Sequence, residues 1–81
     1  MPSRKQLPDN LKRKKLARAL ERLGFEISTK GGSGSHIKAT YISNQKSITI
    51  PDDLRRDVLY YILKEIEGIS GVSWEDIQHF L

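Results

Sequence analysis

The chain has 81 residues and a formal net charge of +4, with 37% hydrophobic and 30% charged residues. A chain of this length forms one domain around a single core, and its composition is too apolar for an intrinsically disordered protein. It contains no cysteine, which excludes disulfides, thiolate nucleophiles and cysteine metal ligands.

Hydropathy and charge limit where the protein acts and what it binds. No apolar run approaches the length of a membrane span, and none follows the basic N-terminus as it would in a secretory signal. We therefore expect a cytoplasmic protein with no membrane contact. The positive charge favours a polyanionic partner without requiring one.

The N-terminal residues show no periodic apolar pattern. Residues 1–10 are therefore predicted to form a mobile tail, and residues 11–81 a single domain. Asp9 or Asn10 is a suitable N-cap for a following helix, because either side chain accepts hydrogen bonds from the amides of a first turn.

A first helix is predicted after this cap, ending at Gly24, since glycine adopts the left-handed conformation that ends many helices. Its apolar residues recur at helical spacing: Leu16, Ala19, Leu20 and Leu23. Its basic residues largely face the other way: Lys14, Lys15, Arg18 and Arg22. This separation is typical of an amphipathic surface helix.

Three strands are predicted between Phe25 and Pro51, because apolar residues there recur at every second position. One side of these strands carries Phe25, Ile27, Thr29, Ile37, Ala39, Tyr41, Ile48 and Ile50. A glycine-rich stretch over 31–35 and the polar segment 43–46 are turns by composition. Pro51 ends the third strand because it has no N–H to donate.

A second long helix is predicted to start at a cap formed by Asp52 or Asp53 and to end at Gly68. Its apolar stripe is Leu54, Val58, Leu59, Ile62, Leu63 and Ile66. The sequence from Ser73 to Asp76 matches a capping box, which predicts a short third helix over 74–81. The fold class is therefore α+β, with helices on one face of a three-stranded antiparallel sheet and the other face open to solvent.

His36 is the main candidate for catalysis. It follows a glycine-rich turn and begins the second predicted strand. A histidine can both take and give a proton near neutral pH, and loops held by a rigid scaffold often carry catalytic groups. Strand alternation assigns His36 and Lys38 to the open face. His36 is either a general acid or base, or an ordinary exposed histidine beside a turn.

The residues around His36 are candidates for substrate binding. Gly34 and Ser35 belong to a turn whose glycines allow the backbone to approach a phosphate or sugar closely. Lys30 and Lys38 flank the turn and either bind a phosphate, stabilising charge that develops on it, or are simply solvated. The turn matches neither a P-loop nor a dinucleotide-binding fingerprint.

The densest positive feature is the run of basic residues from Lys12 to Lys15, extended by Arg18 and Arg22. It is either a solvated helix face or an electrostatic surface for nucleic acid.

Aromatic and acidic residues offer two further candidate sites. The tyrosines are possible base-stacking groups, although Tyr41 belongs to the core face and only one of Tyr60 and Tyr61 need be exposed. His79 lies near two carboxylates without a convincing third ligand, so no metal site is predicted.

Four motifs, taken in chain order, resemble the HicA family of toxins from bacterial and archaeal type II toxin–antitoxin pairs. They are Leu-Gly-Phe at 23–25, Gly-Ser-His at 34–36, Ile-Pro at 50–51 and Leu-Tyr-Tyr-Ile-Leu at 59–63. The resemblance runs from about Leu16 to the end of the chain. It implies a fold like a double-stranded-RNA-binding domain, in the order α-β-β-β-α, and an mRNA interferase that works without the ribosome.

The resemblance also implies a catalytic residue and a partner. The essential histidine of the family's Gly-Ser-His motif corresponds to His36. A HicB-like antitoxin typically covers this histidine, so we expect a hetero-oligomer of toxin and antitoxin, with a role in stress responses.

This chain departs from the family pattern at two places. Many members have a histidine at the position of Ile37, and another shortly after Ile-Pro, where this chain has Asp52 and Asp53. Duplex-RNA-binding domains open their last helix with lysines that bind phosphates. Aspartates at that point argue against duplex binding.

The sequence thus predicts a toxin that cleaves single-stranded mRNA by transesterification, without a metal or other cofactor. His36 would be the general base on the ribose 2′-hydroxyl or the general acid on the leaving oxygen. One alternative is a non-catalytic nucleic-acid-binding module that uses the basic N-terminal helix. Another is a protein-interaction domain that docks an acidic partner.

Overall fold

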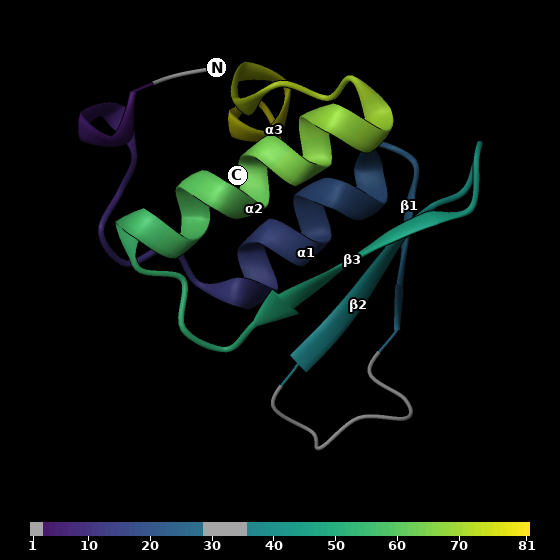
Figure 1. Cartoon of the computed structure of the whole chain (residues 1–81), viewed down its shortest axis with the longest axis horizontal. Helices are drawn as coiled ribbons and strands as arrows, with labels where there is room; N and C mark the ends of the chain where they lie inside the picture. Colours follow the sequence, from purple (N-terminus) through teal and green to yellow (C-terminus); the bar gives the residue numbers. More distant parts are fainter. Residues whose placement is uncertain (1–2, 29–35) are drawn as a thin grey trace.

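The structure is a computed structural model that describes residues 3–28, the backbone of His36, and residues 37–81. Its elements in chain order are η1 (Arg4–Gln6), α1 (Arg13–Arg22), β1 (Phe25–Ser28), β2 (His36–Tyr41), β3 (Lys46–Pro51), α2 (Arg56–Ser70) and α3 (Trp74–Gln78) (Figure 1). This confirms the predicted α+β order and adds η1. No helix in the described part of the chain is both long and apolar enough to cross a membrane.

The three strands form one antiparallel sheet with β2 in the centre. The β2–β3 register runs from His36 opposite Pro51 to Tyr41 opposite Lys46. Successive residues of a strand alternate between the two faces, so every second residue points to the same side. The residues on the inner face are buried: Ile37, Ala39, Ile48 and Ile50. Figure 1 shows α1 and α2 on one side of this sheet.

Among the described residues, one hydrophobic core fills the space between the sheet and the helices. Its buried residues are Leu7, Leu16, Ala19, Leu20, Phe25, Ile37, Ala39, Ile48, Ile50, Leu54, Leu59, Ile62, Leu63, Ile66, Val72, Trp74 and Ile77. Burying each large aliphatic side chain stabilises the fold by about 1.5–3 kcal/mol. The helix layer therefore holds the sheet firmly from one side.

The predicted cap of α1 is wrong. The helix begins at Arg13, and Lys12 occupies the N-cap without a side-chain hydrogen bond. Asp9 and Asn10 lie too early in the chain to reach the amides of the first turn. The Asp9 carboxylate lies 3.2 Å from a guanidinium nitrogen of Arg56 instead.

The predicted cap of α2 is also wrong, because the chain continues past both aspartates before the helix begins. Arg55 is the N-cap and forms no side-chain cap hydrogen bond. Asp53 accepts a hydrogen bond of 2.8 Å from Arg55 Nε, and Asp52 forms an ion pair with Arg13. Leu54, between them and the helix, is buried in the core.

The helix ends are partly as predicted. Gly24 follows α1 with a φ of +97°, as expected. α2 does not end at Gly68 but continues to Ser70, and Gly71, with a φ of +77°, ends it. The capping box of α3 is confirmed, with the Ser73 hydroxyl accepting a hydrogen bond from the Asp76 amide at 3.1 Å. α3 is shorter than predicted and ends at Gln78.

Residues 3–10 pack against the rest of the molecule. Leu7 is only 2% exposed and belongs to the core, and its carbonyl accepts a hydrogen bond of 3.1 Å from Arg56 Nε. Arg4 donates a hydrogen bond of 2.8 Å to the Tyr61 hydroxyl. The division of the chain at residue 11 stays a prediction, but the core extends to Leu7 on the N-terminal side of it.

Candidate functional site

The candidate site lies where β2 begins and β3 ends. His36 is the first residue of β2, and its backbone pairs with Pro51, the last residue of β3. The loop that carries Lys30, Gly34 and Ser35 lies outside the described residues. The structure therefore fixes the backbone position of His36, and leaves the roles of His36 and of these three residues as predictions.

Lys38 is the predicted site residue whose side chain the structure describes. It is exposed, as expected for the face of the sheet that points away from the helices. Its partners in the sheet are Ser28 on β1 and Thr49 on β3. His36 and Lys38 are two residues apart on one strand, so their positions belong to the same face of the sheet.

Polar side chains cover the rest of this face, which we call the open face (Lys38, Thr40, Ser47 and Thr49). The Thr40 and Ser47 hydroxyls lie opposite each other on β2 and β3 and form a hydrogen bond of 2.9 Å. Small hydroxyl side chains leave the sheet accessible to a flat or extended ligand. Glu26 of β1 is exposed and pairs with Thr40, so this face also carries one carboxylate. Lys38 and the hydroxyls can bind a phosphate at the end of the face nearer His36.

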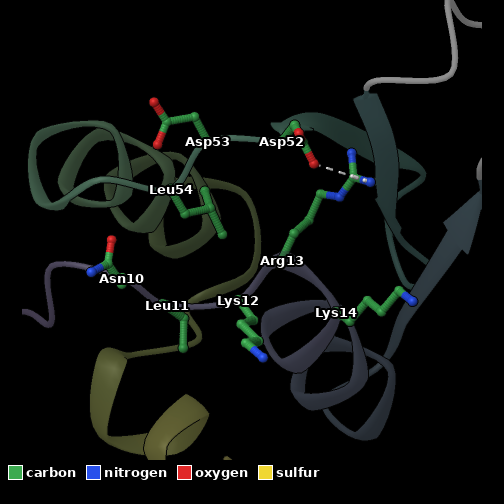
Figure 2. Close-up of a pocket in the computed structure, with 8 residues that line it drawn as sticks. All are labelled: Asn10, Leu11, Lys12, Arg13, Lys14, Asp52, Asp53 and Leu54. Carbon is green, nitrogen blue, oxygen red and sulfur yellow. Dashed lines mark ion pairs between the residues drawn. The ribbon is translucent and has the colours of Figure 1, made fainter.

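An ion pair connects this end of the sheet to α1. A guanidinium nitrogen of Arg13 lies 3.5 Å from a carboxylate oxygen of Asp52. Asp52 directly follows Pro51, the backbone partner of His36. Figure 2 shows Arg13 reaching from the start of α1 to Asp52, while Lys12 and Lys14 point away from that ion pair.

The same region contains an open cavity of about 390 Å³. Its lining comes from the start of α1 and from the β3–α2 connection: Asn10, Leu11, Lys12, Arg13, Lys14, Asp52, Asp53 and Leu54 (Figure 2). The hydrogen bond and the charge of Asp53 raise the pKa of Arg55. Asp52 is paired with Arg13 and Asp53 with Arg55, so the negative charge of these two aspartates is partly compensated.

The basic residues of α1 form a separate feature. Four of them lie on its exposed side: Lys14, Lys15, Arg18 and Arg22. The opposite side of the helix is buried in the core. The structure thus confirms the predicted separation of basic and apolar residues along this helix.

The tyrosines do not gather into a base-stacking surface beside the site. Tyr41 is partly buried and packs on Phe25, with ring centroids 5.0 Å apart. Tyr60 and Tyr61 lie on α2, where the Arg4 guanidinium is 4.8 Å and 5.3 Å from the centres of their rings. Tyr61 is 54% exposed, as expected for one of this adjacent pair.

Sequence reasoning missed long-range side-chain contacts, one at the candidate site and one at the N-terminal segment. The Arg13–Asp52 pair joins residues from different elements, and Arg4 contacts a tyrosine 57 positions away. No local spacing rule reveals such pairs. Among the described residues, no three His, Cys, Asp or Glu side chains gather in a way that could hold a metal ion.

The chain is similar to a known protein family. A family model described as the HicA toxin of bacterial toxin–antitoxin systems matches residues 13–72. No curated protein and no solved structure matches the chain. The matched range begins at the first residue of α1 and ends just after Gly71, so it contains the whole sheet and both long helices.

Proposed function

Because this chain belongs to the HicA family of bacterial toxins, we propose that it cleaves single-stranded RNA with His36 as its catalytic residue. HicA toxins are ribonucleases that act within toxin–antitoxin systems. The finer proposal is a ribosome-independent endoribonuclease that cuts mRNA.

The proposed reaction is transesterification of one phosphodiester. The ribose 2′-oxygen attacks phosphorus, and the bond from phosphorus to the 5′-oxygen of the next nucleotide breaks. The products are a 2′,3′-cyclic phosphate and a 5′-hydroxyl. One proton leaves the 2′-hydroxyl and one reaches the leaving oxygen, and an imidazole can perform either transfer near neutral pH.

The exposure of Lys38 is the observation that carries the proposal. Lys38 lies two positions from His36 on β2, at a position that belongs to the same face of the sheet. Its ammonium group therefore brings a cation to the open face near the backbone position of the histidine. Such a cation stabilises the negative charge that develops on the phosphate during cleavage. We propose that Lys30, Gly34 and Ser35 complete the binding of the phosphate.

A toxin of this kind has an antitoxin partner. We propose a HicB-like protein that covers His36 and forms a hetero-oligomer with this chain. Co-expression with the product of a neighbouring antitoxin gene should give a complex that elutes together and does not cleave RNA. Cleavage by the intact complex would contradict this part of the proposal.

A comparison of the two histidines tests the catalytic role. His36→Ala should reduce cleavage of a labelled single-stranded RNA, in the presence of a chelator, by about a hundred- to ten-thousand-fold. The matched control is His79→Ala, which removes the other histidine, just after α3, and should cleave normally. Both variants should melt close to the wild-type temperature.

Two further results would contradict the mechanism. The first is undiminished cleavage by His36→Ala. The second is cleavage of an RNA whose 2′-hydroxyl is replaced by hydrogen at the cut site. A wild-type protein that binds RNA and never cuts it would instead support the alternative function, a binding module, which the basic side of α1 favours.

A further inference from the structure

The exposed side of α1 carries four basic residues and one acidic residue, Glu21, so its charge is strongly positive. We call it the basic face of α1, and it consists of Lys14, Lys15, Arg18 and Arg22. At 100° per residue these four positions fall within an arc of about 100°. None of them forms an ion pair within the part of the chain that the structure describes. Four neighbouring cations repel one another, so an anionic partner would stabilise them.

The chemistry of this face fits a nucleic acid better than a protein. Protein interfaces have a buried apolar centre, and they are depleted in lysine although enriched in arginine. The large hydrophobic residues that are exposed in the described chain lie on other segments: Ile42, Tyr61, Phe80 and Leu81. A surface of lysine and arginine without apolar residues is suited to phosphate groups, which bind through charge.

The position of the basic face relates it to the candidate site. The helix begins at Arg13, whose guanidinium contacts Asp52, and Asp52 is next to the backbone partner of His36. With a rise of about 1.5 Å per residue, the helix extends about 15 Å from that point. A strand bound along α1 would therefore reach this end of the sheet and would have to pass around it, beside Asp52, to the open face.

We propose that the basic face of α1 holds the phosphate backbone of the RNA strand and delivers it to the site at the start of β2. The interaction is with phosphates and so is independent of base sequence. The inference rests on the proposed function, since it assigns a binding surface to the same substrate. The four residues are positioning residues that act on affinity and leave the chemical step unchanged.

Salt-dependent binding of a 2′-O-methyl RNA tests the proposal, because such an RNA lacks the attacking hydroxyl and stays intact with His36 present. The basic-face variant is Lys14→Gln, Arg18→Gln and Arg22→Gln in one chain, and glutamine is a good helix former. The control variant is Lys5→Gln, Lys46→Gln and Lys64→Gln, which removes the same charge from exposed residues elsewhere. Circular dichroism melts should show that both variants fold.

The basic-face variant should bind more weakly, and its plot of log affinity against log salt should be less steep by about 2, since each single-strand phosphate contact contributes about 0.7. The control variant should keep a slope close to that of the wild type. With a cleavable RNA, the basic-face variant should show a higher KM and an unchanged kcat.

Two outcomes would overturn the proposal. One is a slope for the basic-face variant that equals the slope of the control variant. The other is binding of polyglutamate that depends on the same three residues as strongly as RNA binding does, because this would make the face a docking surface for an acidic protein. Neither outcome would contradict the proposed catalytic role of His36, because the cleavage assay tests that role separately.

Discussion

The Arg13 guanidinium lies 3.5 Å from the Asp52 carboxylate and so joins the first turn of α1 to the connection between β3 and α2. The two partners differ in exposure, since the Arg13 side chain is 20% exposed and that of Asp52 is 76% exposed. The Arg13 side chain is therefore mostly covered by neighbouring residues, whereas the Asp52 side chain is mostly in contact with solvent. Asp52 is therefore the better residue of the two for testing how charge at this end affects binding.

We expect Asp52→Asn to bind single-stranded RNA more tightly, by up to about fivefold at low salt, because the change removes a negative charge near the backbone position of His36. The free energy of unfolding should fall by less than about 1 kcal/mol, as is usual for exposed ion pairs. Fluorescence anisotropy and urea titration would measure the two effects. Glu65→Gln, which removes an exposed charge from α2, is the control and should leave RNA affinity unchanged. Weaker binding by Asp52→Asn would contradict the prediction.

The second prediction concerns the N-terminal segment. Leu7→Ala should lower the free energy of unfolding by about 2–5 kcal/mol, the usual cost of truncating a buried leucine. Leu7 is 2% exposed and packs in the core, whereas Lys5 in the same segment is exposed. Lys5→Ala is therefore the control, and it should change the unfolding free energy little. Equal urea midpoints for both variants would show that residues 1–10 behave as the mobile tail that the sequence predicts.

Much of the fold follows from periodicity. The change from a repeat of about 3.6 to a repeat of 2 after Gly24 separates α1 from the sheet, and both patterns depend on local spacing alone. Helix caps are different, because an aspartate can cap a helix or pair with a distant arginine. Asp9 and Asp52 contact Arg56 and Arg13 instead of capping, and no local pattern contains that information.

For the candidate site, too, the sequence predicts the features that depend on local spacing and misses those that depend on tertiary packing. Alternation along β2 is enough to predict that Lys38 is exposed and Ile37 buried, and the structure confirms both. The proximity of Arg13 to the end of the sheet depends on how α1 packs over β1, which is a tertiary property. Catalysis by His36 stays a prediction.

The third prediction concerns pH and the cap of α3. Hydrogen bonds from Ser73 lower the pKa of Asp76. Because the folded-state pKa is below the unfolded value of about 3.9, the carboxylate stabilises the fold above that pH. This contribution is lost as pH falls through the folded-state pKa. Asp76→Asn should therefore be less stable than the wild type at pH 7, and the difference should shrink below about pH 4.

Urea midpoints measured from pH 7 to pH 2.5 would test this. Glu75→Gln is the control, since Glu75 lies in the same turn while the capping hydrogen bonds belong to Ser73 and Asp76. Its difference from the wild type should be smaller at pH 7 and should vary less with pH. A deficit for Asp76→Asn that stays constant over the whole range would exclude a role for the charge.

The last prediction distinguishes Gly68, inside α2, from Gly71, the C-cap that follows the helix. Gly68 lies inside the helix, and a Cβ built on it meets no atom within 4 Å, whereas Gly71 has a φ of +77° that L-residues rarely adopt. Gly68→Ala should therefore stabilise the protein by about 0.5–1 kcal/mol, because alanine loses less backbone entropy in a helix. Gly71→Ala should destabilise it by about 1–2 kcal/mol, the cost of a left-handed conformation for a residue with a Cβ. Urea titration of the two variants would give both values. A loss of stability for Gly68→Ala would mean that the helix ends at Gly68 in solution, as the sequence alone predicts, and that the final turn to Ser70 is not formed.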